Sequence, residues 1–433
     1  MLLPIQVIFI CVIVWLIWNY LNKRYLRDFF SPFNLLLYFW VLPFFASFMM
    51  LSELQDGLSL EAALIIVVST MILVGISMVP MVLLKGKPLT IRYTNYSLML
   101  IRNGSWLVIW FYIVAFIALY LAEFREGSPL LKYMASETSN PVLHQAGKDS
   151  KLQVIAFGIF VAGMLSFYLG INSRAWASRI LFLGLAIFVP ILGGMKASKT
   201  DIFIPLLSYS ALSYYHFRVK KVRIPKWLVI LMLLVGMLMV SITFIRVRGI
   251  GCQGGYAGLI EFKYSEEIVF PVNEMVAIIY GYMSLGFQNF SNYIKYGDGG
   301  FHIGTSLLRP FLSALMQGDV ADALLAGPYE NLYVVSGAAN VGTFLRDLYI
   351  EGGVMFCIIG SIINAALVNG FYMKFRKREG GMWMFIYIVF LFPWTWLFFM
   401  NAFSVLSHFV NAFYVFAIFS LFVVLKGRKR RIA

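Results

Sequence analysis

One set of basic residues has the side chains and positions to bind phosphate groups at a membrane surface. The set consists of Lys196, Lys199, Arg246, Arg248, Arg309 and Arg346. Guanidinium groups bind phosphate oxygens in pairs, and ammonium groups bind them as point charges. The set therefore predicts a site for pyrophosphate headgroups. For any single residue the alternative is an ion pair with a nearby acid, or a side chain that extends toward water.

Two acidic residues beside Arg346 are candidates for proton transfer. Asp347 and Glu351 are four residues apart, which places them on one face of a helix. A carboxylate there can accept the proton of an attacking hydroxyl group. A structural ion pair with Arg346 explains the same cluster equally well. His302, in a glycine-rich stretch, is a further acid/base candidate because it is the one outward histidine near basic residues.

The sequence contains no motif for a metal or a nucleotide. It lacks zinc-ligand spacing, an Asp-x-Asp pair, a Gly-x-Ser-x-Gly elbow and a Walker loop. Its three cysteines have no metal-like spacing and no obvious pairing. We therefore expect chemistry that uses no metal, no nucleotide and no other cofactor.

The elements that position these residues are predicted to be membrane helices. Hydrophobic residues make up 61% of the 433, and charged residues only 13%, whereas soluble domains average about a quarter charged. We predict an all-α polytopic membrane protein, a single transmembrane domain over residues 1–433, with about 11 helices of roughly 20 apolar residues each. The predicted spans are 3–21, 31–51, 60–84, 104–122, 152–171, 176–194, 201–217, 227–245, 353–373, 381–400 and 404–425.

Charge sorts the connections between these spans into two faces. Alternate connections hold 23 of the 35 basic residues with only Asp28 and Glu379 as acids, which gives +21, and the other face carries −6. Basic connections stay in the cytoplasm. The N-terminus is therefore predicted outside and the C-terminus inside. The net charge of +15 is then mostly a topology signal, and nucleic acid is not an expected partner.

Two outward connections are long, and long connections in compact domains are usually functional. The larger, 246–352, is predicted to be a partly helical periplasmic loop region, with a weakly apolar helix at 268–290. The smaller is 123–151. No internal repeat and no matching pair of broken helices is visible, which weakens a transporter with inverted repeats.

Several segments resemble the O-antigen polymerase (Wzy) family, whose members polymerise oligosaccharide repeat units. The architecture of many spans with a large outward loop in the C-terminal half is similar over nearly the whole chain. Local similarity lies in Gly193-Gly194 with the lysines that follow, and in Gln288–Tyr293 ahead of Arg309-Pro310. The most specific stretch is Asn340–Gly353, an Asn–Thr segment followed by Tyr, an acidic residue and Gly.

The resemblance implies a glycosyltransferase in the inner (cytoplasmic) membrane of a bacterium. It would transfer a glycan from an undecaprenyl-pyrophosphate carrier to a lipid-linked repeat unit at the periplasmic face. The implied partners are that lipid-linked oligosaccharide, membrane lipid and a chain-length regulator protein. The basic set would bind pyrophosphate, and Glu351 or Asp347, with His302 behind them, would be the base. Asn340, Thr343 and Tyr349 would contact the glycan.

Three alternatives stay open at this point. An O-antigen ligase uses the same donor with a lipid A-core acceptor. A lipid-linked oligosaccharide flippase or other transporter is of a different class, and it predicts charged residues in mid-span, which are almost absent here. A non-catalytic assembly partner is the third alternative.

Overall fold

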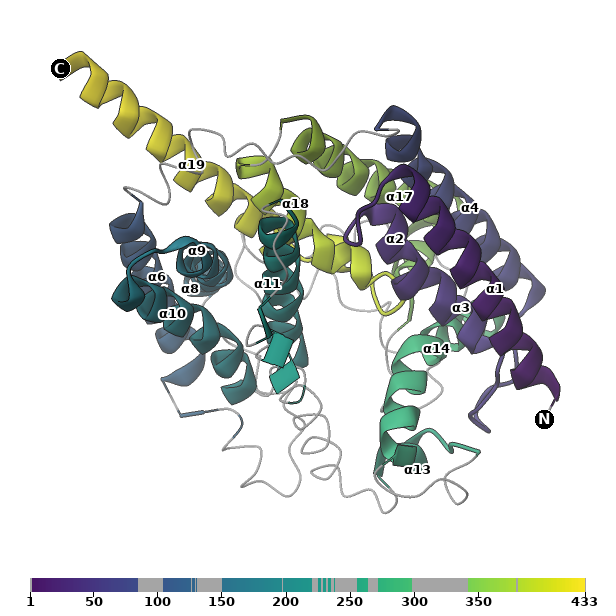
Figure 1. The fold of residues 1–433 in the computed structure, drawn as a ribbon. Coiled ribbons are helices and arrows are strands. Elements are labelled where there is room, and N and C mark those ends of the chain that lie inside the picture. The colour runs from purple at the N-terminus through teal and green to yellow at the C-terminus, as the bar shows by residue number, and fades with distance from the viewer. Residues whose placement is uncertain are drawn as a thin grey trace. The chain divides into compact units, whose positions relative to one another are not determined.

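A computed structural model shows that the described part of the chain is helical (Figure 1). The structure describes residues 2–84, 104–125, 127–128, 130, 150–196, 198–219, a few positions between 225 and 237, 255–263, 272–297, 342–378 and 381–432. Within these ranges the pairing of extended backbone is limited to one isolated antiparallel bridge, between Ser52 and Phe262. The expectation of an all-α protein is confirmed for these residues.

The helices coincide with the predicted spans except 227–245, most of which lies outside the described residues. Six of the described helices are long and apolar enough to cross a membrane: Gln6–Tyr25, Leu60–Leu83, Ser105–Phe124, Leu152–Asn172, Trp176–Met195 and Phe344–Lys377. Shorter apolar helices cover Pro32–Ser47, Met382–Thr395 and Leu406–Phe422. The chain is therefore a membrane protein, and its full number of spans stays a prediction.

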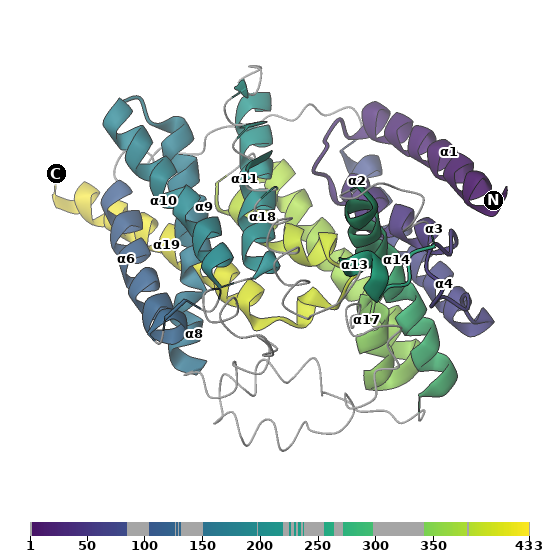
Figure 2. The ribbon, with the colours of Figure 1, turned by 90° about the horizontal axis from the view of Figure 1, so that it is seen from below.

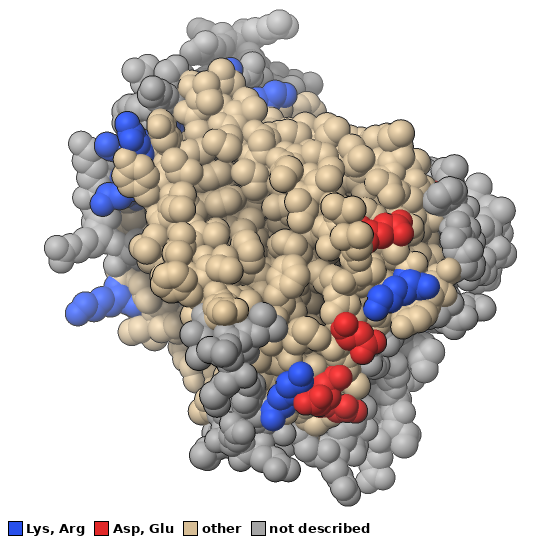
Figure 3. Space-filling model, turned by 90° about the vertical axis from the view of Figure 1, so that its right-hand side faces the viewer, with Lys and Arg blue, Asp and Glu red and all other residues tan. Residues whose placement is uncertain are grey.

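The surface of the described residues also fits a lipid environment. In Figure 3 a broad area carries no charged side chain, and charged residues gather toward its edges. Large apolar side chains point outward from α1 (Leu2–Tyr25) and α4 (Leu60–Leu83); Phe9 is 66% exposed and Met71 is 68% exposed. Such continuous apolar surface is unfavourable in water and favourable against lipid tails.

The chain divides into two compact units, which are described separately. Unit 1 comprises residues 1–89, 252–373 and 392–405, and unit 2 comprises 90–251, 374–391 and 406–433. This division describes packing within the chain. It does not test the prediction of a single transmembrane domain over residues 1–433. The described part of the 246–352 region falls in unit 1, as α13 (Gly255–Leu259), α14 (Val272–Tyr296) and the start of α17 (Phe344–Arg378).

In unit 1, α14 packs against the helical stretch built from α2 (Pro32–Leu36), η1 (Leu37–Val41) and α3 (Leu42–Ser47). The rings of Trp40 and Phe287 lie 5.1 Å apart, and those of Trp40 and Phe344 lie 5.0 Å apart. All three side chains are fully buried. This aromatic contact joins α14 to the beginning of α17, and it sets the position of the candidate site.

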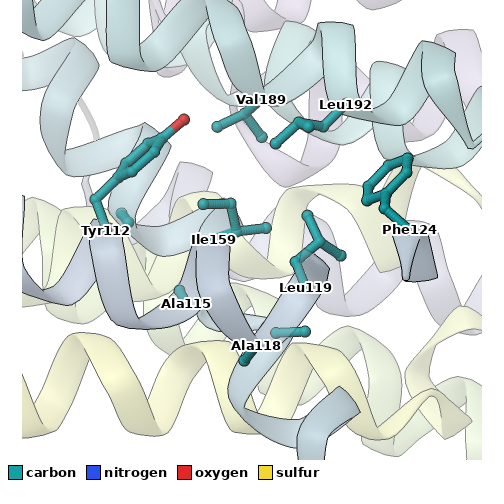
Figure 4. Packing of buried hydrophobic residues seen from close by; sticks show 10 residues of the cluster. Tyr112, Ala115, Ala118, Leu119, Phe124, Ile159, Val189 and Leu192 are labelled. Carbon is teal, nitrogen blue, oxygen red and sulfur yellow. The ribbon is translucent and has the colours of Figure 1, made fainter. Parts of the chain in front are cut away.

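Unit 2 contains α6 (Ser105–Leu119), η2 (Tyr120–Phe124), α8 (Ser150–Ala156), α9 (Gly158–Asn172), α10 (Trp176–Met195), α11 (Lys199–Val219) and α19 (Leu406–Ile432). Helix α9 is its most buried span and lies beside α6, α10 and α11 (Figures 1 and 2). Figure 4 shows the packing of Leu119, Ile159 and Leu192 from three of these helices. Apolar contacts of this kind hold neighbouring membrane helices together.

Two of the described helices, α17 and α18 (Met382–Thr395), contribute residues to both units. Helix α17 passes from unit 1 to unit 2 after Met373, α18 passes from unit 2 to unit 1 after Leu391, and η5 (Ala402–Ser404) follows in unit 1. The helix predicted at 268–290 is found as α14, which begins at Val272 and extends to Tyr296. The smaller loop predicted at 123–151 lies mostly outside the described residues.

Candidate functional site

Two adjacent glycines break helix α17. Gly353 has φ 62° and ψ −151°, a conformation that side chains with a Cβ atom rarely adopt. A Cβ atom on Gly352 would lie 2.1 Å from the ring of Phe356. Glycine is therefore required at Gly353 by the backbone conformation and at Gly352 by the lack of space for a Cβ atom. The span predicted to begin at residue 353 starts at this break.

The residues before the break fold back on those after it. Leu348 lies so close to Gly360 that a Cβ atom there would be 2.4 Å from the leucine side chain. The Cys357 thiol donates a hydrogen bond of 3.4 Å to the Leu345 carbonyl oxygen. In a straight helix these two residues would be about 18 Å apart along the axis. We call residues 344–351 the short arm.

Three ionisable side chains of the short arm are shielded from solvent. Glu351 is fully buried, the Arg346 side chain is 7% exposed and the Asp347 side chain is 14% exposed. Arg346 Nε lies 3.8 Å from Asp347 Oδ1, within the range of an ion pair. Burying charged groups is costly unless they are paired or hydrogen-bonded. This arrangement contributes little to the stability of the fold, so we take it as a candidate functional site.

Hydrogen bonds fix the start of the short arm against a segment that follows α18. The Phe344 N–H donates to the Leu397 carbonyl oxygen at 2.9 Å. The Asn401 N–H donates to Asp347 Oδ2 at 3.0 Å. One carboxylate oxygen of Asp347 therefore accepts a hydrogen bond from the backbone of the segment that follows α18. This contact indicates a positioning role for Asp347.

Tyr349 connects the short arm to two other helices. Its ring packs edge-on against Phe290 and Tyr293 of α14. Its hydroxyl group donates a hydrogen bond of 3.1 Å to Glu61 Oε1 in the first turn of α4. Glu61 was not among the predicted site residues, because a Ser59 cap followed by an acidic residue is also an ordinary helix start.

The C-terminal half of α14 supplies further polar groups near the short arm. A Cβ atom on Gly286 would lie 3.6 Å from the Thr343 backbone nitrogen, so the two segments are in close contact there. Gln288 is buried and donates to the Gly57 carbonyl oxygen at 3.2 Å and to Asn292 Oδ1 at 2.9 Å. The Gln288–Tyr293 segment therefore lies in the same part of unit 1 as Thr343.

Glu274, an acidic residue of the predicted 246–352 loop region, has a structural role. Its side chain is buried, and its two carboxylate oxygens accept hydrogen bonds from the N–H groups of Tyr256 (2.8 Å) and Ala257 (3.1 Å). These are free N–H groups at the start of the short helix α13, where an acid is favourable. The contact fastens α13 to α14.

In unit 2, Lys196 pairs with two acids. Its Nζ lies 2.6 Å from Asp201 Oδ2 and 3.8 Å from Glu123 Oε1. Burial alone would lower the pKa of Lys196, but the two carboxylates outweigh it and raise the pKa above its usual value. We call these three residues the Lys196 cluster. Lys196 thus forms the ion pairs with nearby acids that were the alternative to phosphate binding.

Gly193 lies close to the backbone at the start of α11. A Cβ atom there would lie 2.8 Å from the Asp201 carbonyl carbon. The Ser198 hydroxyl accepts a hydrogen bond from the Asp201 N–H at 3.2 Å, as a helix cap does. Lys199 is the first residue of α11, and its side chain lies outside the described residues.

The structure brings together five of the predicted site residues in unit 1: Thr343, Arg346, Asp347, Tyr349 and Glu351. Five others lie outside the described residues: Arg246, Arg248, His302, Arg309 and Asn340. No group of three His, Cys, Asp or Glu residues in the described ranges is arranged to hold a metal ion.

Comparison of the chain with protein-family models, with curated proteins and with solved structures finds no match in any of the three. The functional argument therefore rests on the short arm and on the sequence.

Proposed function

We propose that the protein is a glycosyltransferase of the O-antigen polymerase type. It transfers a glycan from an undecaprenyl-pyrophosphate carrier to the sugar of a lipid-linked repeat unit. The observation that carries the proposal is the burial of Arg346, Asp347 and Glu351 on the short arm of a broken membrane helix. The resemblance of the Asn340–Gly353 segment to that family supplies the substrate class.

The reaction forms one bond and breaks another. The acceptor hydroxyl oxygen attacks the anomeric carbon of the donor sugar, and the bond from that carbon to the phosphate oxygen breaks. The hydroxyl proton passes to a carboxylate, and the lipid pyrophosphate leaves as the anion. Positioned cations stabilise the charge that develops on this leaving group.

Each described residue of the short arm has a distinct part in the proposal. Arg346 binds the pyrophosphate, because a guanidinium group contacts two phosphate oxygens at once. Glu351 is the base, and Asp347, which accepts a hydrogen bond from the Asn401 backbone, positions the short arm. Glu351 is fully buried, so the proposal requires the chain to open at Gly352–Gly353 when substrate binds.

The proposed setting is the periplasmic face of a bacterial inner membrane. The distribution of charge supports it, because the 246–352 connection, which contains the short arm, falls on the face with a net charge of −6 and fewer basic residues. Lipid-linked substrates reach such a site from within the membrane. Lys196 takes a lesser part, because two carboxylates already balance its charge.

A lipid-linked oligosaccharide transporter is the second candidate, and the break in α17 favours it. Many transporters bind their substrates where a membrane helix is interrupted. In α17 the interruption turns the short arm back on the helix, whereas the two halves of a transporter's broken helix usually continue across the membrane. We therefore rank this candidate second.

The test is polymerisation by the purified full-length protein in lipid vesicles that contain lipid-linked repeat units. Arg346→Ala should lower the rate by about 10²–10³-fold, the usual effect of removing one charge-stabilising group. Arg346→Glu should be worse, because it also repels phosphate. The control is Arg174→Ala, which removes an exposed arginine of unit 2.

The carboxylate is tested in the same assay. Glu351→Gln should lower the rate by about 10²–10⁴-fold, as expected for loss of a general base, and Glu53→Gln, at an exposed position of unit 1, should not. Wild-type rates for both Arg346→Ala and Glu351→Gln would reject the proposal. Movement of the substrate across the vesicle membrane without longer products would favour the transporter. Transfer to lipid A-core alone would indicate a ligase.

A further inference from the structure

Helix α1 has one face packed into unit 1 and the opposite face exposed. Val7, Trp18 and Asn22 form the packed face, and each is at most 9% exposed. The Trp18 ring stacks on Phe33 with the ring centres 4.2 Å apart, and its Nε1 donates a hydrogen bond of 2.9 Å to the Phe33 carbonyl oxygen. These contacts determine which side of α1 points outward.

The exposed face changes from apolar to basic along the helix. Its residues recur at helical spacing on the side opposite Trp18, within a stripe roughly 100° wide. They are Phe9 (66% exposed), Ile13 (41%), Leu16 (55%) and Tyr20 (58%), followed by the exposed Lys23 and Arg24. We call these six residues, together with Arg27 just beyond the helix, the α1 stripe. Because the candidate span covers Gln6–Tyr25, the stripe extends from the hydrocarbon region to the membrane surface.

Two tyrosine side chains hold the guanidinium group of Arg24. Its Nη1 donates a hydrogen bond of 2.8 Å to the Tyr20 hydroxyl, and its Cζ lies 5.9 Å and 5.5 Å from the ring centres of Tyr20 and Tyr25. A guanidinium group has five N–H donors, so this hydrogen bond leaves others for a ligand. Tyrosine is enriched at the interface between membrane and water, which is the level of the lipid headgroups.

Arg27 has a backbone conformation that favours glycine. Its φ is 53°, and its N–H donates a hydrogen bond of 2.7 Å to the Asn22 carbonyl oxygen at the end of α1. Glycine adopts this conformation without steric cost, whereas arginine does not. The closure of α1 therefore gives no reason for a guanidinium group at this position.

The acid nearest to these cations in the sequence points inward. Asp28 is the one acidic residue among residues 1–52, and it is fully buried. Its carboxylate accepts hydrogen bonds from the Phe30 N–H (3.1 Å) and the Tyr372 hydroxyl (2.8 Å). Within the described ranges, neither Lys23 nor Arg24 forms an ion pair with an acid. Their charges can therefore bind an anion from outside the chain.

We propose that the α1 stripe binds one anionic phospholipid. The phosphodiester lies among Lys23, Arg24 and Arg27, because guanidinium groups contact two phosphate oxygens at once. The acyl tails lie along the apolar part of the stripe, from Phe9 to Leu16. The site selects a net negative headgroup over a zwitterionic one, since each basic residue at the membrane surface adds to the attraction. It does not involve the short arm, so the proposal is independent of the glycosyltransferase activity.

The experiment is photolabelling of the full-length protein in phosphatidylcholine vesicles. Two probes are compared at equal mole fraction, phosphatidylglycerol and phosphatidylcholine, each with the same photoactive group in an acyl tail. Mass spectrometry then locates the label on the chain. In the wild-type protein, residues 9–20 should be labelled about tenfold more by the phosphatidylglycerol probe. Equal labelling by the two probes would overturn the proposal.

Two triple variants separate a local contact from the net charge of the protein. Lys23→Gln, Arg24→Gln and Arg27→Gln together should bring the labelling ratio of residues 9–20 close to one. The matched control combines Arg174→Gln, Arg179→Gln and Lys377→Gln, which removes the same charge from exposed positions of unit 2. This control should keep the wild-type ratio, and an equal loss in both triple variants would contradict the proposal.

Arg27→Gly distinguishes lipid binding from a structural role of Arg27. Glycine suits φ 53°, so the melting temperature should not fall. The labelling ratio should fall by about fivefold, the effect of one basic residue at the membrane surface. A lower melting temperature with an unchanged ratio would overturn the proposed role of Arg27 in binding the phosphodiester.

Discussion

The short arm of unit 1 and the Lys196 cluster of unit 2 contain the same charges, one cation and two carboxylates. They differ in geometry and in exposure to solvent. The Lys196 and Asp201 side chains are 22% and 37% exposed and lie 2.6 Å apart. The Arg346 and Asp347 side chains are 7% and 14% exposed, and the atoms of their ion pair are 3.8 Å apart.

The difference shows that charge composition alone does not identify a site. A close, partly exposed ion pair contributes little to stability, and the charge of its cation is already balanced by the carboxylate. A buried pair with a longer separation is more costly to form. Its cation is less fully compensated and can therefore bind an anionic ligand more strongly. Only the short arm also depends on a helix broken by glycines.

The largest expected effect comes from removing one acid of each cluster. Asp347→Ala should lower the free energy of unfolding by about 3–5 kcal/mol, because it leaves a buried arginine without that carboxylate and frees the Asn401 N–H. Asp201→Ala should cost no more than about 1 kcal/mol. Both values can be measured by unfolding in mixed micelles, and equal losses would contradict the distinction between the clusters.

The next effect tests the broken helix. Gly353→Ala should lower the free energy of unfolding by about 1–3 kcal/mol, because alanine is strained at φ 62° and ψ −151°. Gly370→Ala is the control on the same helix, where a Cβ atom would meet nothing within 4 Å. That substitution should be neutral or should stabilise by up to about 1 kcal/mol. The reverse order of the two variants would show that the break is not required.

The smallest effect concerns the contact between the short arm and α4. Tyr349→Phe removes the hydrogen bond to Glu61 and keeps the ring, so it should cost about 1 kcal/mol. Tyr120→Phe, at a position that is 50% exposed, should change stability by less than about 0.5 kcal/mol. Thermal unfolding of the two variants in detergent measures both, and a larger loss for Tyr120→Phe would contradict this contact.

The helices could be predicted from the sequence because apolar length alone indicates a membrane span. The spacing of Asp347 and Glu351 also predicted one helix face correctly, since both lie within the helical short arm. The folding back of that arm could not be predicted. It depends on contacts of Leu345 with Cys357 and of Leu348 with Gly360, and no local pattern encodes such contacts.

Residues whose partners lie far away in the sequence were the hardest to interpret. Glu274 resembles an exposed loop acid until Tyr256 and Ala257 are placed beside it. The side chain of Glu61 accepts a hydrogen bond from Tyr349, which lies 288 residues later in the sequence. Lys196 was predicted as a phosphate ligand, and the acids that balance its charge come from two different helical elements.

The central claim is that the short arm, and not the Lys196 cluster, carries the chemistry. The most direct test compares Arg346→Ala with Lys196→Ala in one polymerisation assay on lipid-linked repeat units, at matched amounts of folded protein. We predict that Arg346→Ala loses about 10²–10³-fold in rate and that Lys196→Ala stays within about fivefold of wild type. A larger loss for Lys196→Ala than for Arg346→Ala would contradict the claim.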